Sequence, residues 1–265
     1  MTVLLTGANG RIGRSLAELL PGLGWQLRGI DRTPGPPGQL VGELTDPAAL
    51  DAAMADVEAV VHLAGQATET AWPVIRESNI EGAVQLFEAA RRAGVRRVVF
   101  ASSNHAVGFT PRGTAELAAD TPPRPDTLYG VSKVFGEALG RYYHDRYAFQ
   151  VACLRIGTFA DTPPDGRSQA TWLAPSDCAR LVDACLRSDA LGYALIWGIS
   201  ANRHRWWSLA AGQQLDYQPV EDASAYGGPA AGDDQRVGGM FTEPHFGIDE
   251  VAERERSAQA KGDRR

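Results

Sequence analysis

The stretch TGANGRIG, residues 6–13, decides the fold. It ends an apolar run, VLLTG (3–7), and leads into RIGRSLAELL (11–20), where apolar residues recur at helical spacing. Gly7, Gly10 and Gly13 have the spacing GxxGxxG, a variant of the dinucleotide fingerprint. Such glycines permit a tight turn and let the backbone approach a pyrophosphate at a helix N-terminus. A glycine-rich turn without a ligand is the alternative, but the strand before it and the helix after it favour a dinucleotide site.

An acid at the end of the next expected strand refines the cofactor. The run WQLRGID (25–31) ends in Asp31. A carboxylate there accepts hydrogen bonds from the adenosine ribose hydroxyls and repels a 2′-phosphate, so it favours NAD over NADP. Arg11 and Arg32 count mildly against this, because either could pair with a phosphate. The predicted cofactor is NAD.

Strand and helix patterns alternate along the rest of the chain. Further strands are expected at 57–65, 95–103, 149–157 and 193–200, and further helices at about 73–93, 128–147 and 176–187. Alternation of this kind predicts an α/β fold, a doubly wound parallel sheet of the Rossmann type. No repeat or linker is evident, so one domain over 1–265 is expected. Segments of about 158–175 and 200–248 are expected to form a small substrate lobe, and 250–265 a charged, frayed tail.

The composition narrows the class of protein. The chain has 265 residues, 44% hydrophobic and 22% charged, with a net charge of −6, which argues against nucleic acid and anionic membranes as partners. No apolar run approaches the roughly 18–20 residues of a membrane span, and no leader precedes the first strand, so a cytoplasmic protein is expected. Three cysteines without CxxC spacing are expected to be reduced, buried thiols rather than metal ligands.

Tyr129 and Lys133, in LYGVSK (128–133), are candidates for chemistry. Four residues apart in an expected helix, they lie on one face. A nearby ammonium lowers the pKa of a phenol toward neutrality, which would give a general base. A surface Tyr–Lys pair is the alternative. The glycine loop earlier in the chain and a serine at the end of the preceding strand favour the catalytic interpretation.

Together these motifs resemble a known superfamily. The chain is similar to the extended-type short-chain dehydrogenases/reductases, the NAD-dependent epimerase/dehydratase superfamily, and within it to the bacterial uronate dehydrogenases. The superfamily resemblance covers essentially residues 1–200 and rests on TGANGRIG, Asp31, ELTD (43–46), HLAG (62–65), Asn79, SSNHAVG (102–108) and LYGVSK. The narrower resemblance rests on SSNHAVGFTP, LYGVSK, LRIGT (154–158), RSQATW (167–172) and WGISANRHRWW (197–207).

The resemblance implies a role for each matching residue. Ser103 would hydrogen-bond the substrate hydroxyl, Tyr129 would take its proton, and Lys133 would hold the nicotinamide ribose. The implied cofactor site comprises Gly7, Gly10, Arg11, Ile12, Gly13, Asp31, Arg32, Glu43, Leu44, Leu63, Ala64, Gly65, Asn79, Tyr129, Lys133 and Ile156. The implied substrate site comprises Ser103, Asn104, His105, Thr158 and Arg167.

Three substrate residues carry the specificity in this interpretation. Asn104 and His105 can match the donor and acceptor groups of a sugar, although either could instead cap a turn. Arg167 can clamp a carboxylate through two parallel hydrogen bonds, although a solvated loop arginine is the alternative. The sequence departs from the family at Ala67 and Thr158, where the family tends to carry serine, and at Glu43, where it usually carries aspartate.

The function implied by the resemblance is NAD-dependent oxidation of a hexuronate, glucuronate or galacturonate, at C1 to an aldaro-lactone. The alternatives are a nucleotide-sugar epimerase or dehydratase, or another sugar dehydrogenase of the superfamily. Against an epimerase or dehydratase, only about 100 residues follow LRIG, which is short for holding a nucleotide diphosphate. A non-catalytic NAD-binding regulator is a further alternative, although such proteins often lack the tyrosine or lysine. A small sugar acid is the expected ligand and a homo-oligomer the expected assembly.

Overall fold

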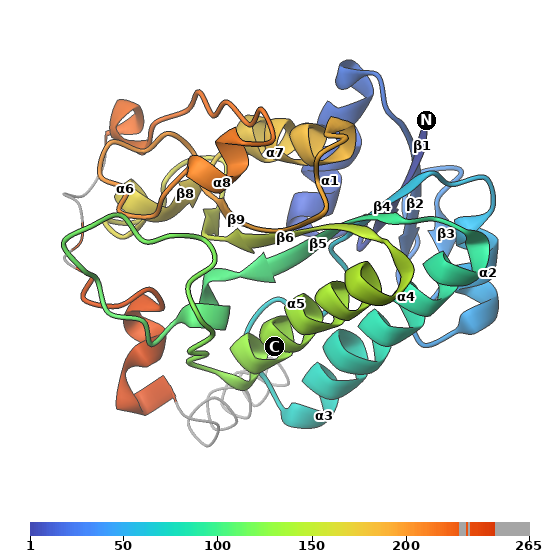
Figure 1. Cartoon of the computed structure of the whole chain (residues 1–265), viewed down its shortest axis with the longest axis horizontal. Coiled ribbons are helices and arrows are strands. Elements are labelled where there is room, and N and C mark those ends of the chain that lie inside the picture. The colour runs from blue at the N-terminus through green and yellow to red at the C-terminus, as the bar shows by residue number, and fades with distance from the viewer. Residues whose placement is uncertain (228–231, 233, 247–265) are drawn as a thin grey trace, which may run out of the picture.

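A seven-stranded parallel sheet forms the centre of the molecule, as a computed structural model of the whole chain shows (Figure 1). The structure describes residues 1–227, 232 and 234–246, so the predicted tail at 250–265 lies outside the described residues. The sheet order is β3-β2-β1-β4-β5-β6-β9. Its strands are β1 (Thr2–Thr6), β2 (Gln26–Asp31), β3 (Leu40–Val41), β4 (Ala59–His62), β5 (Arg97–Ser103), β6 (Gln150–Ile156) and β9 (Tyr193–Gly198).

Helices cover both faces of this sheet. The helices of the described chain are α1 (Arg11–Leu19), α2 (Pro47–Met54), α3 (Trp72–Ile75), α4 (Gly82–Ala93), α5 (Leu128–Tyr147), α6 (Ser168–Thr171), α7 (Pro175–Arg187) and α8 (Ala210–Gln213). The helices α1 and α7 pack on one face, with Leu16 and Val182 in the core between them and the sheet. The helices α2, α4 and α5 pack on the other, with Leu50, Phe87 and Tyr143 in a second core. The predicted doubly wound Rossmann-type sheet is confirmed.

The position of the site follows from this winding. Strand β1 pairs in parallel with β2 on one side and β4 on the other. The chain leaves β1 toward the α1 face and leaves β4 toward the α4 face (Figure 1). Loops that diverge in this way leave a crevice at the carboxyl ends of the two strands, the usual ligand position in open parallel sheets.

The structure corrects several expected elements. The helix expected at about 73–93 is interrupted between α3 and α4 by a π-helical segment, Arg76–Glu81. The short elements α2 and β3 were not predicted from the sequence, although Asp46 and Pro47 were a signal for α2: the Asp46 side chain accepts from Ala48 and Ala49 and caps the helix. A separate parallel pair, β7 (Thr158–Phe159) and β8 (Trp172–Leu173), was also missed. Within the described residues, no helix is both long and apolar enough to cross a membrane.

A buried ion pair fixes the elements beneath the site. Arg155 on β6 donates from Nε and Nη2 to the two carboxylate oxygens of Glu137 on α5, at 2.9 and 2.8 Å. Its Nη1 donates to the main-chain oxygens of Ala119 and Thr121, both at 2.8 Å, and Ser102 on β5 donates to Glu137 at 2.5 Å. Both charged side chains are buried, so removing one partner would leave an uncompensated charge. The network ties β5, β6 and α5 to the loop before α5.

Candidate active site

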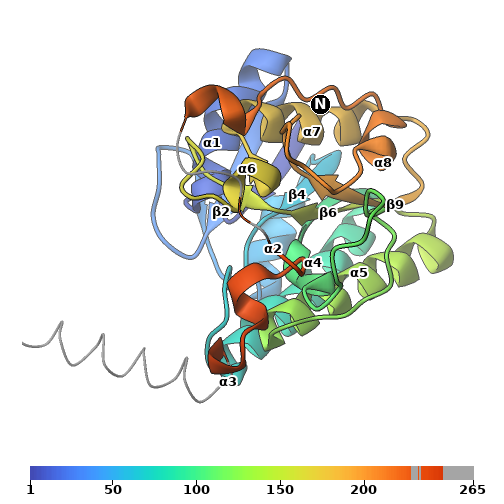
Figure 2. The same ribbon diagram turned by 90° about the vertical axis from the view of Figure 1, so that its left-hand side faces the viewer.

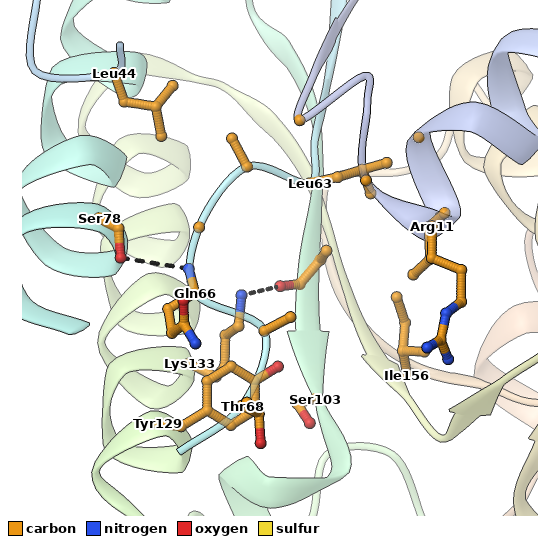
Figure 3. Close-up of a pocket in the computed structure, with 18 of the residues that line it drawn as sticks. Arg11, Leu44, Leu63, Gln66, Thr68, Ser78, Ser103, Tyr129, Lys133 and Ile156 are labelled. Carbon is orange, nitrogen blue, oxygen red and sulfur yellow. Dashed lines mark hydrogen bonds between the residues drawn. The ribbon is translucent and has the colours of Figure 1, made fainter. Parts of the chain in front are cut away.

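A cleft of about 970 Å³ opens at the carboxyl ends of β1, β4 and β5 (Figure 3). The glycine loop, the end of β2, the loop after β4, the end of β5 and the start of α5 form its walls. Most of the residues predicted from the sequence line it: Gly7, Gly10, Arg11, Ile12, Gly13, Asp31, Arg32, Glu43, Leu44, Leu63, Ala64, Gly65, Ser103, Asn104, His105, Tyr129, Lys133 and Ile156. Among the described residues, Asn79, Thr158 and Arg167 lie outside this lining.

The glycine loop is shaped to admit a dinucleotide. Gly7 has φ +69°, and a Cβ on it would lie 2.8 Å from the main-chain nitrogen of Ala64. A Cβ on Gly13 would lie 2.2 Å from the main-chain oxygen of Gly7. Helix α1 begins at Arg11 with no side-chain cap and no acid in its first turn, as far as the structure describes the chain. Its first N–H groups therefore remain available to a pyrophosphate, and the residues present fit the cofactor.

Asp31 lies at the end of the cleft that β2 forms. Its Oδ2 accepts from the main-chain nitrogen of Asn9 at 3.0 Å, and its Oδ1 accepts from the main-chain nitrogen of Thr33 at 3.0 Å. These bonds hold the carboxylate at the end of β2, where it also lines the cleft. A carboxylate oxygen accepts more than one hydrogen bond, so Asp31 retains capacity for ribose hydroxyls.

Asn79 was predicted to line the cleft on the route to the nicotinamide, but its side chain is buried outside the lining. Its Oδ1 accepts from the main-chain nitrogen of Gln66 at 2.6 Å, and its Nδ2 donates to the main-chain oxygen of Gln66 at 3.0 Å. Nδ2 also donates to Ser132 Oγ on α5 at 2.9 Å. The amide is buried behind the loop after β4 rather than exposed in the cleft. Asn79 therefore fixes the loop whose residues Gln66, Ala67 and Thr68 line the cleft.

Ser103, Tyr129 and Lys133 converge at the other end of the cleft (Figure 3). The Lys133 ammonium donates to the main-chain oxygen of Ala101 at 2.9 Å and lies 5.4 Å from the centroid of the Tyr129 ring. The Ser103 side chain also lies beside the phenol of Tyr129 and lowers its pKa. Thr127 caps α5 by accepting from Gly130, so the helix begins one residue before Tyr129. The helix and the end of β5 thus bring the three side chains together.

The expected pKa of Tyr129 is wrong for the protein alone. The pKa of Tyr129 is raised to about 12: burial is the main cause, Ser103 acts against it, and the charge of Asp126 adds to it. Burial also lowers the pKa of Lys133 to about 8, partly offset by Glu137. Loss of solvation penalises the charged form of each group, and it is the largest cause of both shifts.

The Asn-His pair has partners that the sequence did not indicate. The side chain of Asn104 donates to the main-chain oxygen of Val237 at 3.2 Å. Nδ1 of His105 lies 2.8 Å from Oδ2 of Asp126, a carboxylate with no exposed surface. The ring of Phe241 packs edge-on against the imidazole, with centroids 4.5 Å apart. Neither Asp126 nor Phe241 was predicted from the sequence, because neither lies in a recognisable motif.

A second missed carboxylate supports Tyr129. Oε2 of Glu69, a buried residue of the loop after β4, accepts from the main-chain nitrogen of Tyr129 at 2.7 Å. A carboxylate at a helix N-terminus is favoured by the unpaired N–H groups and the helix dipole. Together, Asn79 and Glu69 attach the two ends of the segment 66–69 to the helical layer, and that segment forms one wall of the cleft.

Arg167 and Thr158 have partners within the protein. Nη1 of Arg167 lies 3.1 Å from Oδ2 of Asp234, and its Nη2 donates to the main-chain oxygen of Val237 at 2.5 Å. The hydroxyl of Thr158 lies 2.9 Å from that of Thr171. Val237 accepts from both Asn104 and Arg167, so this carbonyl joins two residues that are predicted to hold different groups of one substrate.

Comparisons with known proteins define the class. The model of the NAD dependent epimerase/dehydratase family matches residues 3–167. The chain belongs to this family, which confirms the predicted NAD cofactor.

Within the family the chain is similar to uronate dehydrogenases. It is 36% identical to the uronate dehydrogenase of Pseudomonas putida over 254 residues, which cover 90% of this chain and 94% of the relative. A crystal structure of a uronate dehydrogenase mutant from Agrobacterium tumefaciens, complexed with NAD, matches with a TM-score of 0.83 at 36% identity, covering 91% of this chain and 96% of that one. An NAD-dependent glucose-6-phosphate dehydrogenase of Haloferax volcanii is 37% identical over 251 residues, covering 84% and 95%. The predicted resemblance is confirmed, as is the predicted class of NAD-dependent dehydrogenase.

Proposed function

We propose that this protein oxidises a hexuronate, glucuronate or galacturonate, at C1 and passes the hydride to NAD. The observation that carries the proposal is the convergence of Ser103, Tyr129 and Lys133 at one end of a cleft whose other end is the glycine loop. The similarity to uronate dehydrogenases supports the choice of substrate.

Ser103, Tyr129 and Lys133 have separate roles in the oxidation of the anomeric carbon. Ser103 hydrogen-bonds the anomeric hydroxyl, and Tyr129 removes its proton as the hydride leaves C1. Lys133 holds the nicotinamide ribose and favours the phenolate of Tyr129. When bound, the oxidised nicotinamide accepts the hydride and adds a positive charge beside the phenol, which opposes the effect of burial on its pKa.

The product of this step is a lactone. Loss of the hydroxyl proton and of hydride from C1 converts the C1–O bond of a cyclic hemiacetal into the carbonyl of a 1,5-lactone. The hydride reduces NAD to NADH, so the step needs no water and no further oxidant. The open aldarate forms later by hydrolysis away from the enzyme.

The substrate lies with its carboxylate toward Arg167 in this proposal. Arg167 and Asn104 share Val237 as a partner, which supports their action on one ligand. With the C6 carboxylate on the guanidinium, C1 is at the far end of the ring and reaches Tyr129, while Asn104 and His105 hold hydroxyls between the two ends. All five of Glu43, Leu44, Leu63, Ala64 and Gly65 line the cleft; in this proposal the last three contact the nicotinamide and the first two the adenine.

A substrate panel tests the function. NADH formation, followed by nicotinamide absorbance, is measured with glucuronate, galacturonate, glucose, glucose 6-phosphate and UDP-glucose. We expect the highest kcat/KM for a hexuronate. A hexose 6-phosphate also carries an anion at carbon 6. A preference for it would change the substrate that we assign, but the sugar would still bind with its anion toward Arg167 and C1 toward Tyr129. Reaction only with nucleotide sugars would refute the proposal. NMR in the first minutes should show a 1,5-lactone before any open aldarate.

We also propose a domain organisation and an assembly for the chain. Residues of about 158–175 and 200–248 form a substrate lobe on a single nucleotide-binding domain. Figure 2 supports this for the described part, where α6 and the segment after β9 lie together beside the sheet. Assembly as a homo-oligomer in the cytoplasm remains a prediction. Light scattering of the purified chain tests the oligomeric state.

A further inference from the structure

A buried carboxylate lies directly behind the imidazole of His105. The side chain of Asp126 has no exposed surface, and its two oxygens lie 3.0 and 2.8 Å from Nδ1 of His105. A Cβ on Gly108 or on Gly238 would come within 1.9 Å of its Oδ2. Because the backbone approaches so closely from both sides, the carboxylate has no room to turn away from the imidazole.

The imidazole is held from other directions as well. The hydroxyl of Thr127 donates to Oδ1 of Asp126 at 3.1 Å and so helps to orient the carboxylate. The rings of Tyr129 and Phe241 pack edge-on against His105, with centroids 5.9 and 4.5 Å away. His105 also lines the cleft. Since Nδ1 faces Asp126, Nε2 is the ring nitrogen left for a ligand.

The chemistry of the pair decides which nitrogen carries the proton. An ionised carboxylate only accepts hydrogen bonds, so the Nδ1 that it contacts must be protonated. In a neutral imidazole the other nitrogen is then a bare acceptor. The carboxylate of the Ser-His-Asp triad fixes a histidine tautomer in this way, and replacing it by an amide preserves the geometry while reversing the tautomer.

We propose that Asp126 is a positioning residue that fixes His105 as its Nδ1–H tautomer, so that Nε2 accepts a hydrogen bond from a hydroxyl of the sugar acid. The proposal rests on the proposed function for the identity of the ligand. Asp126 thereby determines specificity: the site selects a sugar with a hydroxyl donor at that position over the deoxy or O-methyl analogue, which has no proton to donate.

The tautomer can be measured without any substrate. Long-range ¹H–¹⁵N spectra of the whole chain report which imidazole nitrogen is protonated, and His105→Gln assigns the signal. We expect a protonated Nδ1 and a bare Nε2 near neutral pH, and the opposite or a mixture in Asp126→Asn. A wild-type His105 protonated on Nε2 alone would overturn the proposal, even if the variant failed to fold.

Kinetics separate positioning from a general structural role. Asp126→Asn should raise KM for the hexuronate about tenfold, as loss of one hydrogen bond would, and leave KM for NAD unchanged. Asp120→Asn removes the same charge from an exposed site in the same loop and should change neither. In a His105→Gln background, Asp126→Asn should cause no further rise in KM for the hexuronate. Independent, additive losses would refute the proposal. Failure of the proposed function is distinguishable, because the wild type would then oxidise no hexuronate while the spectra still report the tautomer.

Discussion

The guanidinium of Arg167 and the carboxylate of Asp234 form an ion pair, with Nη1 and Oδ2 3.1 Å apart. Both side chains are largely buried. A substrate carboxylate that binds Arg167 must therefore share or displace a carboxylate of the protein. The pair places the cationic clamp and a competing anion in the same part of the molecule.

Removing Arg167 should weaken the binding of sugar acids more than that of neutral sugars. We expect Arg167→Ala to raise KM for a hexuronate at least about tenfold, since hydrogen bonds to charged groups contribute about 1.5–3 kcal/mol. KM for the matching neutral aldose should change far less, because it has no carboxylate to lose. Initial rates with glucuronate and glucose check this. An equal effect on both sugars would show that Arg167 does not bind the carboxylate.

Removing the competing anion should act in the opposite direction. Asp234→Asn frees the guanidinium from an ionic partner, so we expect a several-fold lower KM for the hexuronate and little change for glucose. Asp161→Asn, at an exposed position in the loop before Arg167, is the matched control for the change in net charge. A higher KM in Asp234→Asn would indicate that the ion pair organises the site rather than competing with the substrate.

Tyr129 is the proposed general base, and its removal should impair the chemical step. Tyr129→Phe should lower kcat by about 10²–10⁴, the usual contribution of a general base, with NAD still bound. Stopped-flow rates check the loss of kcat, and calorimetric titration with NAD checks that the cofactor still binds. A variant that kept most of its turnover would show that another group takes the proton.

The pH profile addresses the raised pKa of Tyr129. The value of about 12 applies to the protein alone, so with saturating NAD we expect kcat/KM to rise with pH and level off well below pH 12. The positive nicotinamide ring stabilises the phenolate, which lowers the pKa of the base. A profile that still rose steeply above about pH 10 would mean that the cofactor does not have this effect.

Asp31 should set the choice of cofactor. We expect a preference for NAD over NADP of roughly 2–3 kcal/mol in kcat/KM, because a 2′-phosphate would lie beside the carboxylate. Asp31→Asn should shrink this preference, since the amide oxygen can still accept from Asn9 while the repelling charge is gone. Glu18→Gln, exposed on α1, is the charge-matched control. Equal kcat/KM for both cofactors in the unmodified protein would contradict the assignment.

The sequence predicted the parts of the site that lie in short local patterns. The glycine loop, Asp31, and α5 with Tyr129 and Lys133 each combine a motif with a periodic element, and the expected helix at 128–147 matches α5. The supporting carboxylates were missed because their contacts are distant in sequence: Glu69 meets Tyr129 60 residues later, and Asp234 meets Arg167 67 residues earlier. A residue's type shows what it can bind, but only the folded chain shows which partner it has.

Asn79 shows that a motif can identify a residue without predicting where its side chain lies. The family motif predicted a residue facing the cleft, yet the side chain is directed at the main chain of Gln66. The π-helical segment that carries Asn79 shifts the helical register there, and hydrophobic periodicity alone gave one continuous helix. Burial likewise decided the pKa of Tyr129, and spacing along the sequence contains no information on solvation.

His62, at the end of β4, makes a prediction about stability. It is buried, its Nδ1 lies 2.8 Å from the hydroxyl of Thr6, and burial together with the charge of Lys133 lowers its pKa from 6.5 to about 3. Between these values the unfolded chain binds a proton that the folded chain does not, so stability falls as pH falls from 6.5 toward 3. At about pH 4 the contribution lost is roughly 3 kcal/mol.

A variant without this titration should resist acid better. His62→Gln keeps an acceptor for the Thr6 hydroxyl and cannot take up a proton, so its free energy of unfolding should decline less than that of the wild type between about pH 6.5 and 4. Urea unfolding at several pH values gives the free energy of unfolding against pH for the wild type and for His62→Gln. The titration of other groups is common to both proteins and cancels in the difference. Parallel curves would mean that His62 takes up its proton in the folded protein as readily as in the unfolded chain, so that burial and the charge of Lys133 do not lower its pKa.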